Sequence, residues 1–123
     1  MTTVVLWADR FDECRDFYRH LLGAHLMHES PTFVEVRSEC AAVLLHRVPA
    51  EWASDTSKPA QTREDNPIKP VFEVASIEGA RAALSHIAGR LFDPSTQQTY
   101  ELMTYCDGVD PDGNVIQVFE QAK

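Results

Sequence analysis

The strongest constraint on the fold of this chain is an internal repeat, which appears when the sequence is aligned with itself at a shift that brings Val5–Ala8 onto Val71–Val74. The same shift brings Leu22–Gly23 onto Ala88–Gly89. Each half begins with a β-rich run and continues as an amphipathic helix that ends at glycine. A chain of 123 residues that repeats one such unit is expected to fold as two similar modules packed on each other.

The apolar spacing within each half predicts one helix and several short strands. The first helix is predicted over Phe11–Leu22, with Asp9 in position to cap it and Gly23 to stop it. The second is predicted between Ser76, its cap, and Gly89, its stop. The strands predicted after the helices are His25–Glu29, Thr32–Arg37 and Ala42–Val48 in the first half, and Arg90–Phe92, Thr99–Thr104 and Asn114–Glu120 in the second.

Each half is therefore predicted to be a β-α-β-β-β module, and the fold class is α+β. We expect a single domain with module one at 1–48, a connector at 49–68 and module two at 69–123. The connector is rich in proline and polar residues and has no periodicity of its own. Trp52 lies within it, and we expect its indole to pack on the body of the protein or to cover a ligand.

The last predicted strand follows a turn signature and has two distinct faces. Asp110–Gly113 has proline at its second position and glycine at its fourth, which indicates a type I turn. The strand after it alternates, so one face is wholly aliphatic and is expected to pack on a helix. That face holds Ile116 and Val118, and the opposite face holds Val115, Gln117 and Phe119.

Composition excludes several classes of partner and compartment. With 11 Lys+Arg against 19 Asp+Glu, the chain carries a formal charge of −8 and no basic patch, so neither nucleic acid nor an anionic membrane is an expected partner. Cys14, Cys40 and Cys106 are widely spaced and form no C-x-x-C pair, which indicates a reduced, cytoplasmic protein. The apolar N-terminal run breaks at Asp9 and lacks a basic start, so it is not expected to be a signal peptide.

Two stretches at the ends of the chain, read with the repeat, suggest a family. Asp9–Gly23, which contains Asp-Phe-Tyr-x-x-Leu-Leu-Gly, and Asp110–Gln117 resemble the vicinal oxygen chelate superfamily of glyoxalase I, bleomycin-resistance proteins and extradiol dioxygenases. The resemblance covers nearly the whole chain. It implies that the sheets form a cup with the helices outside and the pocket inside, and it implies a homodimer.

The resemblance also implies four positions for metal ligands, on the first and last strands of each module. In this sequence they are Thr3, Leu45, Lys69 and Gln117. Leucine has no donor atom and a lysine ammonium repels a cation, so only Gln117 is a plausible ligand and neither a metal nor another cofactor is expected. A shift of one residue in the fourth strand would bring His46 into the cup in place of Leu45, and that alternative stays open.

The same strand parity predicts what lines the cup. Trp7 and Phe119 offer faces to an aromatic or cationic group, and Lys69 and Glu73 can pair with each other or with a ligand. Tyr105 is expected at the rim, because it precedes a loop expected at Cys106–Asp112. The inward positions are Thr3, Val5 and Trp7 on the first strand, Lys69, Val71 and Glu73 on its counterpart, and Val115, Gln117 and Phe119 on the last; the candidate ligand-binding residues are Trp7, Trp52, Lys69, Glu73, Tyr105, Gln117 and Phe119.

These observations favour a metal-independent protein of the glyoxalase/bleomycin-resistance type that binds a small organic molecule in the cup. The −8 charge and the aromatic wall suggest a cationic antibiotic of the bleomycin kind as the ligand. One alternative is an enzyme, either a metal-dependent lyase or dioxygenase that uses His46 and Gln117, or a metal-free isomerase with Glu73 as its base. Another is a non-catalytic scaffold whose cup is filled by its own side chains.

Overall fold

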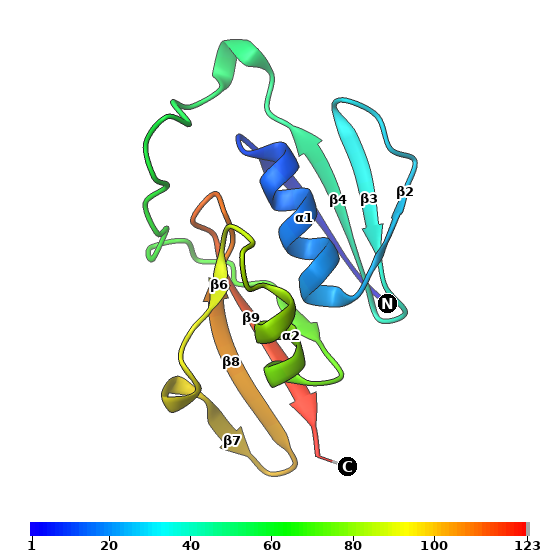
Figure 1. Ribbon diagram of the computed structural model, residues 1–123, viewed down its shortest axis with the longest axis vertical. Coiled ribbons are helices and arrows are strands. Elements are labelled where there is room, and N and C mark those ends of the chain that lie inside the picture. The colour runs from blue at the N-terminus through cyan, green and yellow to red at the C-terminus, as the bar shows by residue number, and fades with distance from the viewer. Residues whose placement is uncertain (123) are drawn as a thin grey trace.

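Two mixed β-sheets and two α-helices make up residues 1–122, the part of the chain that this computed structural model describes (Figure 1). The last residue of predicted module two, Lys123, lies outside the described residues. The first sheet has four strands in the order β1-β4-β3-β2, with β1 parallel to β4 and the other neighbours antiparallel. Its elements are β1 (Thr2–Ala8), α1 (Phe11–Leu22), β2 (His25–Met27), β3 (Phe33–Arg37) and β4 (Ala41–Arg47).

The second sheet repeats this strand order. It runs β5-β9-β8-β6, again with the first pair parallel, and an additional short strand, β7, pairs with β8. The two sheets do not join into one, but their common order confirms the α+β fold of paired β-α-β-β-β modules predicted from the repeat. The elements are β5 (Val71–Glu73), α2 (Ile77–Ala83), β6 (Arg90–Leu91), β7 (Gln98–Tyr100), β8 (Met103–Val109) and β9 (Val115–Gln121), with short 3₁₀ helices η1 (Ala50–Trp52) and η2 (Pro94–Thr96).

The predicted strand at Thr99–Thr104 is wrong, because a turn at Glu101, where φ is 55°, divides it into β7 and β8. Strand β8 then continues through residues of the expected loop at Cys106–Asp112. Gly108 explains this continuation, since a Cβ there would lie 2.6 Å from the carbonyl oxygen of Arg90 on β6. Gly108 therefore permits close strand pairing.

The helix ends agree with the sequence only in part. Helix α1 ends as predicted at Gly23, which adopts the left-handed conformation with φ 58°. The side chain of Ser76 caps α2 as predicted, but α2 ends at Ala83 rather than at Gly89. Asp9 does not cap α1, since its carboxylate accepts instead from the backbone N–H of Ser54 at 3.0 Å. No helix within residues 1–122 has the length and apolar character needed to cross a membrane.

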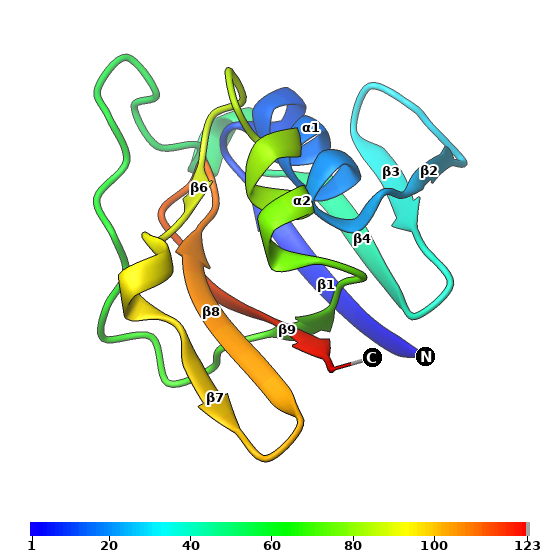
Figure 2. The same ribbon diagram turned by 60° about the horizontal axis from the view of Figure 1, so that its bottom comes forward.

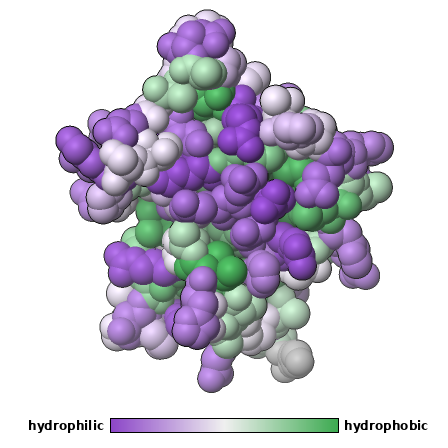
Figure 3. All heavy atoms as spheres, turned by 45° about the horizontal axis from the view of Figure 1, so that its top comes forward, coloured by the Kyte–Doolittle hydropathy of each residue, from purple (hydrophilic) through white to green (hydrophobic). Residues whose placement is uncertain are grey.

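Both helices cover the same side of the two sheets, and the core lies between helices and strands (Figure 2). On β9, Ile116 and Val118 are fully buried, which confirms that the aliphatic face packs inward. The core continues between the modules, where the rings of Tyr18 on α1 and Phe72 on β5 lie 6.0 Å apart. The surface seen in Figure 3 is mostly hydrophilic, and its hydrophobic side chains form small separate patches.

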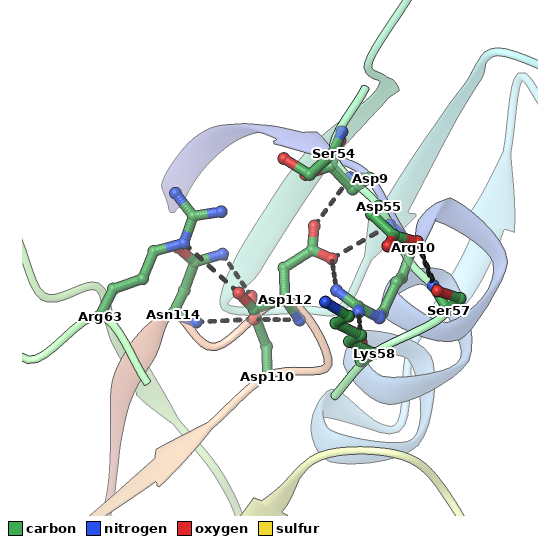
Figure 4. A network of polar contacts seen from close by, with 10 residues as sticks. All are labelled: Asp9, Arg10, Ser54, Asp55, Ser57, Lys58, Arg63, Asp110, Asp112 and Asn114. Atoms are coloured by element: carbon green, nitrogen blue, oxygen red, sulfur yellow. Dashed lines mark hydrogen bonds and ion pairs between the residues drawn. The ribbon is translucent and has the colours of Figure 1, made fainter. Parts of the chain in front are cut away.

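A buried turn of module two holds the start of helix α1 in module one (Figure 4). The carboxylate of Asp112 accepts from the backbone N–H groups of Asp9 at 2.8 Å and Arg10 at 3.0 Å, so it provides the cap that α1 lacks locally. Asp110 accepts from the hydroxyl of Tyr18 at 2.6 Å and from the backbone and side chain of Asn114. Burial raises the pKa of Asp110, and these hydrogen bonds oppose the shift.

The connector lies across the same turn. The backbone N–H of Arg63 donates to the carbonyl of Gly113 at 2.8 Å, and the guanidinium of Arg10 donates to the carbonyl of Lys58. Gly113 has φ 87°, and a Cβ there would lie 2.1 Å from the carbonyl oxygen of Gln61. The turn of module two, the start of α1 and the connector therefore form one interlocked unit.

Candidate functional site

Each sheet has one face turned away from the helices, which we call its open face. Alternation along β1 puts Val4, Leu6 and Ala8 toward α1 and leaves the residues between them on the open face. The pairing register extends this face across the sheet. The open face of the first sheet holds Thr3, Val5 and Trp7 from β1, Ala42, Leu44 and His46 from β4, and Phe33, Glu35 and Arg37 from β3.

An aromatic row crosses this open face. The rings of Trp7 and His46 stack with centroids 4.5 Å apart and planes 17° apart, and the ring of Phe33 lies 4.9 Å from His46 on the other side. Trp7 is nevertheless 57% exposed, and Val5 beside it is 54% exposed. The row thus presents a large apolar ring to solvent in a fixed orientation, because its neighbours hold it in place.

The prediction that Leu45 occupies the metal-ligand position of the fourth strand is wrong. Leu45 is fully buried on the helix side of β4, and its neighbours Leu44 and His46 occupy the open face. Leu44 pairs with Val5 as Gln117 pairs with Val71, so Leu44 is the counterpart of Gln117 in module one. The run Ala41–Leu45 is apolar throughout, and its alternation therefore could not indicate which side faces the helix.

The open face of the second sheet has the same layout with different chemistry. Glu73, Phe119 and Tyr105 form the row equivalent to Trp7, His46 and Phe33, and the rings of Tyr105 and Phe119 lie 5.8 Å apart. Tyr105 therefore lies within a strand on this face, and not in a rim loop. The neighbouring row holds Val71, Gln117 and Asp107.

Asp107 connects two of the predicted site residues. Its carboxylate accepts from the ammonium of Lys69 at 2.9 Å and from the side-chain amide of Gln117 at 3.0 Å. Lys69 thus pairs with Asp107, and Glu73 lies exposed in the next row. The sequence does not single out Asp107, because its segment is expected to be a loop. The signal that could have identified it is its position opposite Gln117, had residues 103–109 been recognised as a strand.

Trp52 belongs to neither open face. It lies in the connector helix η1 and is 75% exposed. The expected packing of its indole on the body of the protein is therefore wrong. A short 3₁₀ turn flanked by extended residues holds it at the surface, and no buried residue belongs to η1.

The residues at the family's metal positions do not fit a metal. On the observed register the set is Thr3, Leu44, Lys69 and Gln117, which offers one hydroxyl, one amide and an ammonium already paired with Asp107. His46 does lie on the open face, as the alternative register required, but its ring stacks on Trp7 and lies against the tilted ring of Phe33. Within residues 1–122 no three histidine, cysteine, aspartate or glutamate side chains converge as a metal site would need.

Two hollows lie where the modules meet. The larger, of about 850 Å³, is bordered by the end of α1, the β3–β4 turn and the start of α2. The smaller, of about 380 Å³, lies between the start of α1 and the Asp110–Gly113 turn, beneath the connector. Neither of these two hollows is a pocket inside a cup, and Val5, Trp7 and Val71 on the open faces are exposed.

Solved structures share this architecture at low sequence identity. A glyoxalase/bleomycin resistance protein from Albidiferax ferrireducens T118 aligns with a TM-score of 0.66 and 16% identity over 98% of each chain. A glyoxalase/bleomycin resistance protein/dioxygenase family enzyme from Burkholderia phytofirmans PsJN aligns with a TM-score of 0.67 and 13% identity, over 97% of this chain and 96% of that one. A lactoylglutathione lyase from Agrobacterium tumefaciens aligns with a TM-score of 0.60 and 15% identity, over 98% of this chain and 92% of that one.

No protein-family model matches the sequence, and no curated protein matches it. Likeness at these identities concerns the fold, because one fold supports many activities. The repeated strand order, the two helices on one side and the full-length structural matches together show that this chain has the fold of the vicinal oxygen chelate superfamily.

Proposed function

We propose that the protein binds a small organic molecule, aromatic or cationic, on the open faces of its sheets and without a metal. The observation that carries the proposal is the row of Trp7, His46 and Phe33, in which the exposed ring of Trp7 stacks on His46. An exposed aromatic ring is unfavourable in water, and a ring that is also held in orientation suits a planar or cationic partner. Phe119 and Tyr105 supply a second such surface on the other sheet.

Two further observations support this proposal over its alternatives. The donor set at the family's metal positions, with leucine and a paired lysine among them, does not suit a metal-dependent lyase or dioxygenase. The side chains of Val5 and Trp7 are more than half exposed, so the chain does not fill this face with its own side chains, as a scaffold would. An isomerase with Glu73 as base is not favoured, since Glu73 is exposed on its strand and not held in a closed site.

We further propose that the protein is a cytoplasmic homodimer in which a second copy covers the open faces. Val5, Trp7 and Met27 on one sheet and Val71 on the other are exposed hydrophobic residues on those faces, and a second copy would enclose the ligand against them. The three cysteines are unpaired, which suits a reducing compartment. Sedimentation velocity tests the dimer: a concentration-independent monomer would contradict it.

The two tryptophans allow a direct test of ligand binding. A Trp52→Phe variant reports on Trp7 alone, and a Trp7→Phe variant reports on Trp52 alone in the exposed connector. Titration with bleomycin should give a saturable change of fluorescence in Trp52→Phe and none in Trp7→Phe. If neither variant responds at micromolar bleomycin, the bleomycin class is excluded.

Elemental analysis tests the metal independence. Protein purified without added metal is expected to contain less than a stoichiometric amount of Zn, Ni, Mn or Fe. One equivalent of any of them, together with loss of ligand binding on chelation, would overturn this part of the proposal.

A further inference from the structure

We propose that Lys69, Asp107 and Gln117 recognise a neutral carboxamide group on an aromatic ligand. This inference rests on the proposed function, because it assigns the chemical class of a ligand to the open face of the second sheet. Its basis is the hydrogen bonding of Asp107, which holds one nitrogen of each neighbour at 2.9 and 3.0 Å.

The carboxylate of Asp107 determines which atoms stay available. A carboxylate only accepts hydrogen bonds, so Gln117 must turn its Nε2 toward Asp107 and present its Oε1 elsewhere. The ammonium of Lys69 uses one of its three N–H groups on Asp107 and keeps the others. The cluster therefore offers one acceptor oxygen, on Gln117, and the remaining N–H groups of Lys69 as donors, and a carboxamide carries the complementary acceptor and donor.

Charge also selects a neutral group. Lys69 and Asp107 neutralise each other, so a ligand carboxylate would gain from Lys69 but would face the charge of Asp107 and the oxygen of Gln117. A ligand ammonium would gain from Asp107 but would face Lys69. Glu73, exposed in the next row, favours a ligand that donates, as the nitrogen of an amide does.

The aromatic part of the ligand has its own surface beside this cluster. Phe119 lies two residues from Gln117 on the same face of β9, a separation of about 6.5 Å along a strand. Tyr105 continues the row, with its ring 5.8 Å from that of Phe119. A ligand ring that lies on Phe119 can thus place an attached carboxamide over Gln117 and Lys69.

Three fragments that share one ring and differ in the polar group test this assignment: benzamide, benzoate and benzylamine. Backbone ¹H–¹⁵N chemical shifts of the full chain, titrated with each fragment, give the affinity and the binding face. Benzamide is expected to bind about tenfold more tightly than the other two, with shifts at Val71, Gln117 and Phe119.

Two variants change the charge without changing the size of the side chain greatly. Asp107→Asn releases Lys69, so benzoate should become the preferred fragment, and Lys69→Met leaves the Asp107 carboxylate unpaired, so benzylamine should become preferred. Asp65→Asn, the same chemical change at an exposed connector position, should leave the order of affinities unchanged. The spectrum of each free variant shows whether it is folded.

The outcomes separate this inference from the function that it rests on. Binding of benzoate or benzylamine on the open face, as tightly as benzamide or more so, refutes the carboxamide assignment and leaves small-molecule binding supported. An order of affinities that neither variant changes also refutes it, because the cluster would then not make the contact. If no fragment shifts any open-face resonance at millimolar concentration, the inference fails, while the bleomycin titration still tests the proposed function independently.

Discussion

Replacement of Asp112 by alanine is expected to destabilise the whole protein, because this carboxylate joins the two modules. It accepts from the backbone N–H groups of Asp9 and Arg10, and it lies 3.5 Å from the guanidinium of Arg10. The side chains of Asp112 and Arg10 are only 2% and 12% exposed. Water therefore cannot readily replace the lost acceptor in Asp112→Ala.

The size of the effect follows from these contacts. Hydrogen bonds to a charged group contribute about 1.5–3 kcal/mol each, and loss of one partner of a buried ion pair costs about 3–5 kcal/mol. These contributions overlap, since they share one carboxylate, so a loss of about 3–5 kcal/mol is expected from a total stability of about 5–15 kcal/mol. For a chain of 123 residues this lowers Tm by about 12–20 °C.

Urea unfolding followed by circular dichroism measures the change. Asp112→Asn keeps one acceptor and should lose about half as much stability, whereas Asp65→Ala, in the exposed connector, should lose almost none. In a double-mutant cycle with Arg10→Met, the Asp112→Ala effect should shrink, since no buried charge is left behind. A loss below about 1 kcal/mol for Asp112→Ala, or strict additivity with Arg10→Met, would refute the proposed role of this carboxylate.

Three further outcomes can be measured. Burial, together with the charge of Asp110, raises the pKa of Tyr18 well above its usual value of 10.0. Above pH 10 the folded state therefore keeps a proton that the unfolded chain loses, and the free energy of unfolding should fall as pH rises. Tyr18→Phe should lower stability by about 1–3 kcal/mol at neutral pH and flatten this alkaline decline in urea unfolding. Of the three thiols, only Cys40 is exposed, so Ellman's reagent should titrate one thiol in the native protein and none in Cys40→Ser. In Gly113→Ala the new Cβ would clash with the carbonyl oxygen of Gln61, so the connector should be displaced there. Limited proteolysis should then cut the connector faster than in the wild type.

The sequence by itself determined the architecture of this protein. Two copies of one β-α-β-β-β pattern, each too small to bury a sufficient core alone, require the helices and sheets to pack as they do. Local chemistry also determined the left-handed stop at Gly23, the cap at Ser76 and the aliphatic inner face of β9. These features depend on neighbours within a few residues, and such patterns are visible in the sequence.

Only the tertiary structure decided the details of the open faces. Strand β4 is apolar on both sides, so its pairing and the helix beneath it, rather than alternation, brought His46 beside Trp7 and turned Leu45 inward. Asp107 became part of the candidate site through pairing with Gln117 across the second sheet.

The cap of α1 by Asp112 likewise depends on residues 102 and 103 positions apart. Contacts over such distances arise only when the chain is folded, because hydrogen bonding across modules has no local periodicity for a sequence to display. The scaffold of this protein is thus encoded in its local patterns, and the chemistry that its open faces present comes from how the strands meet.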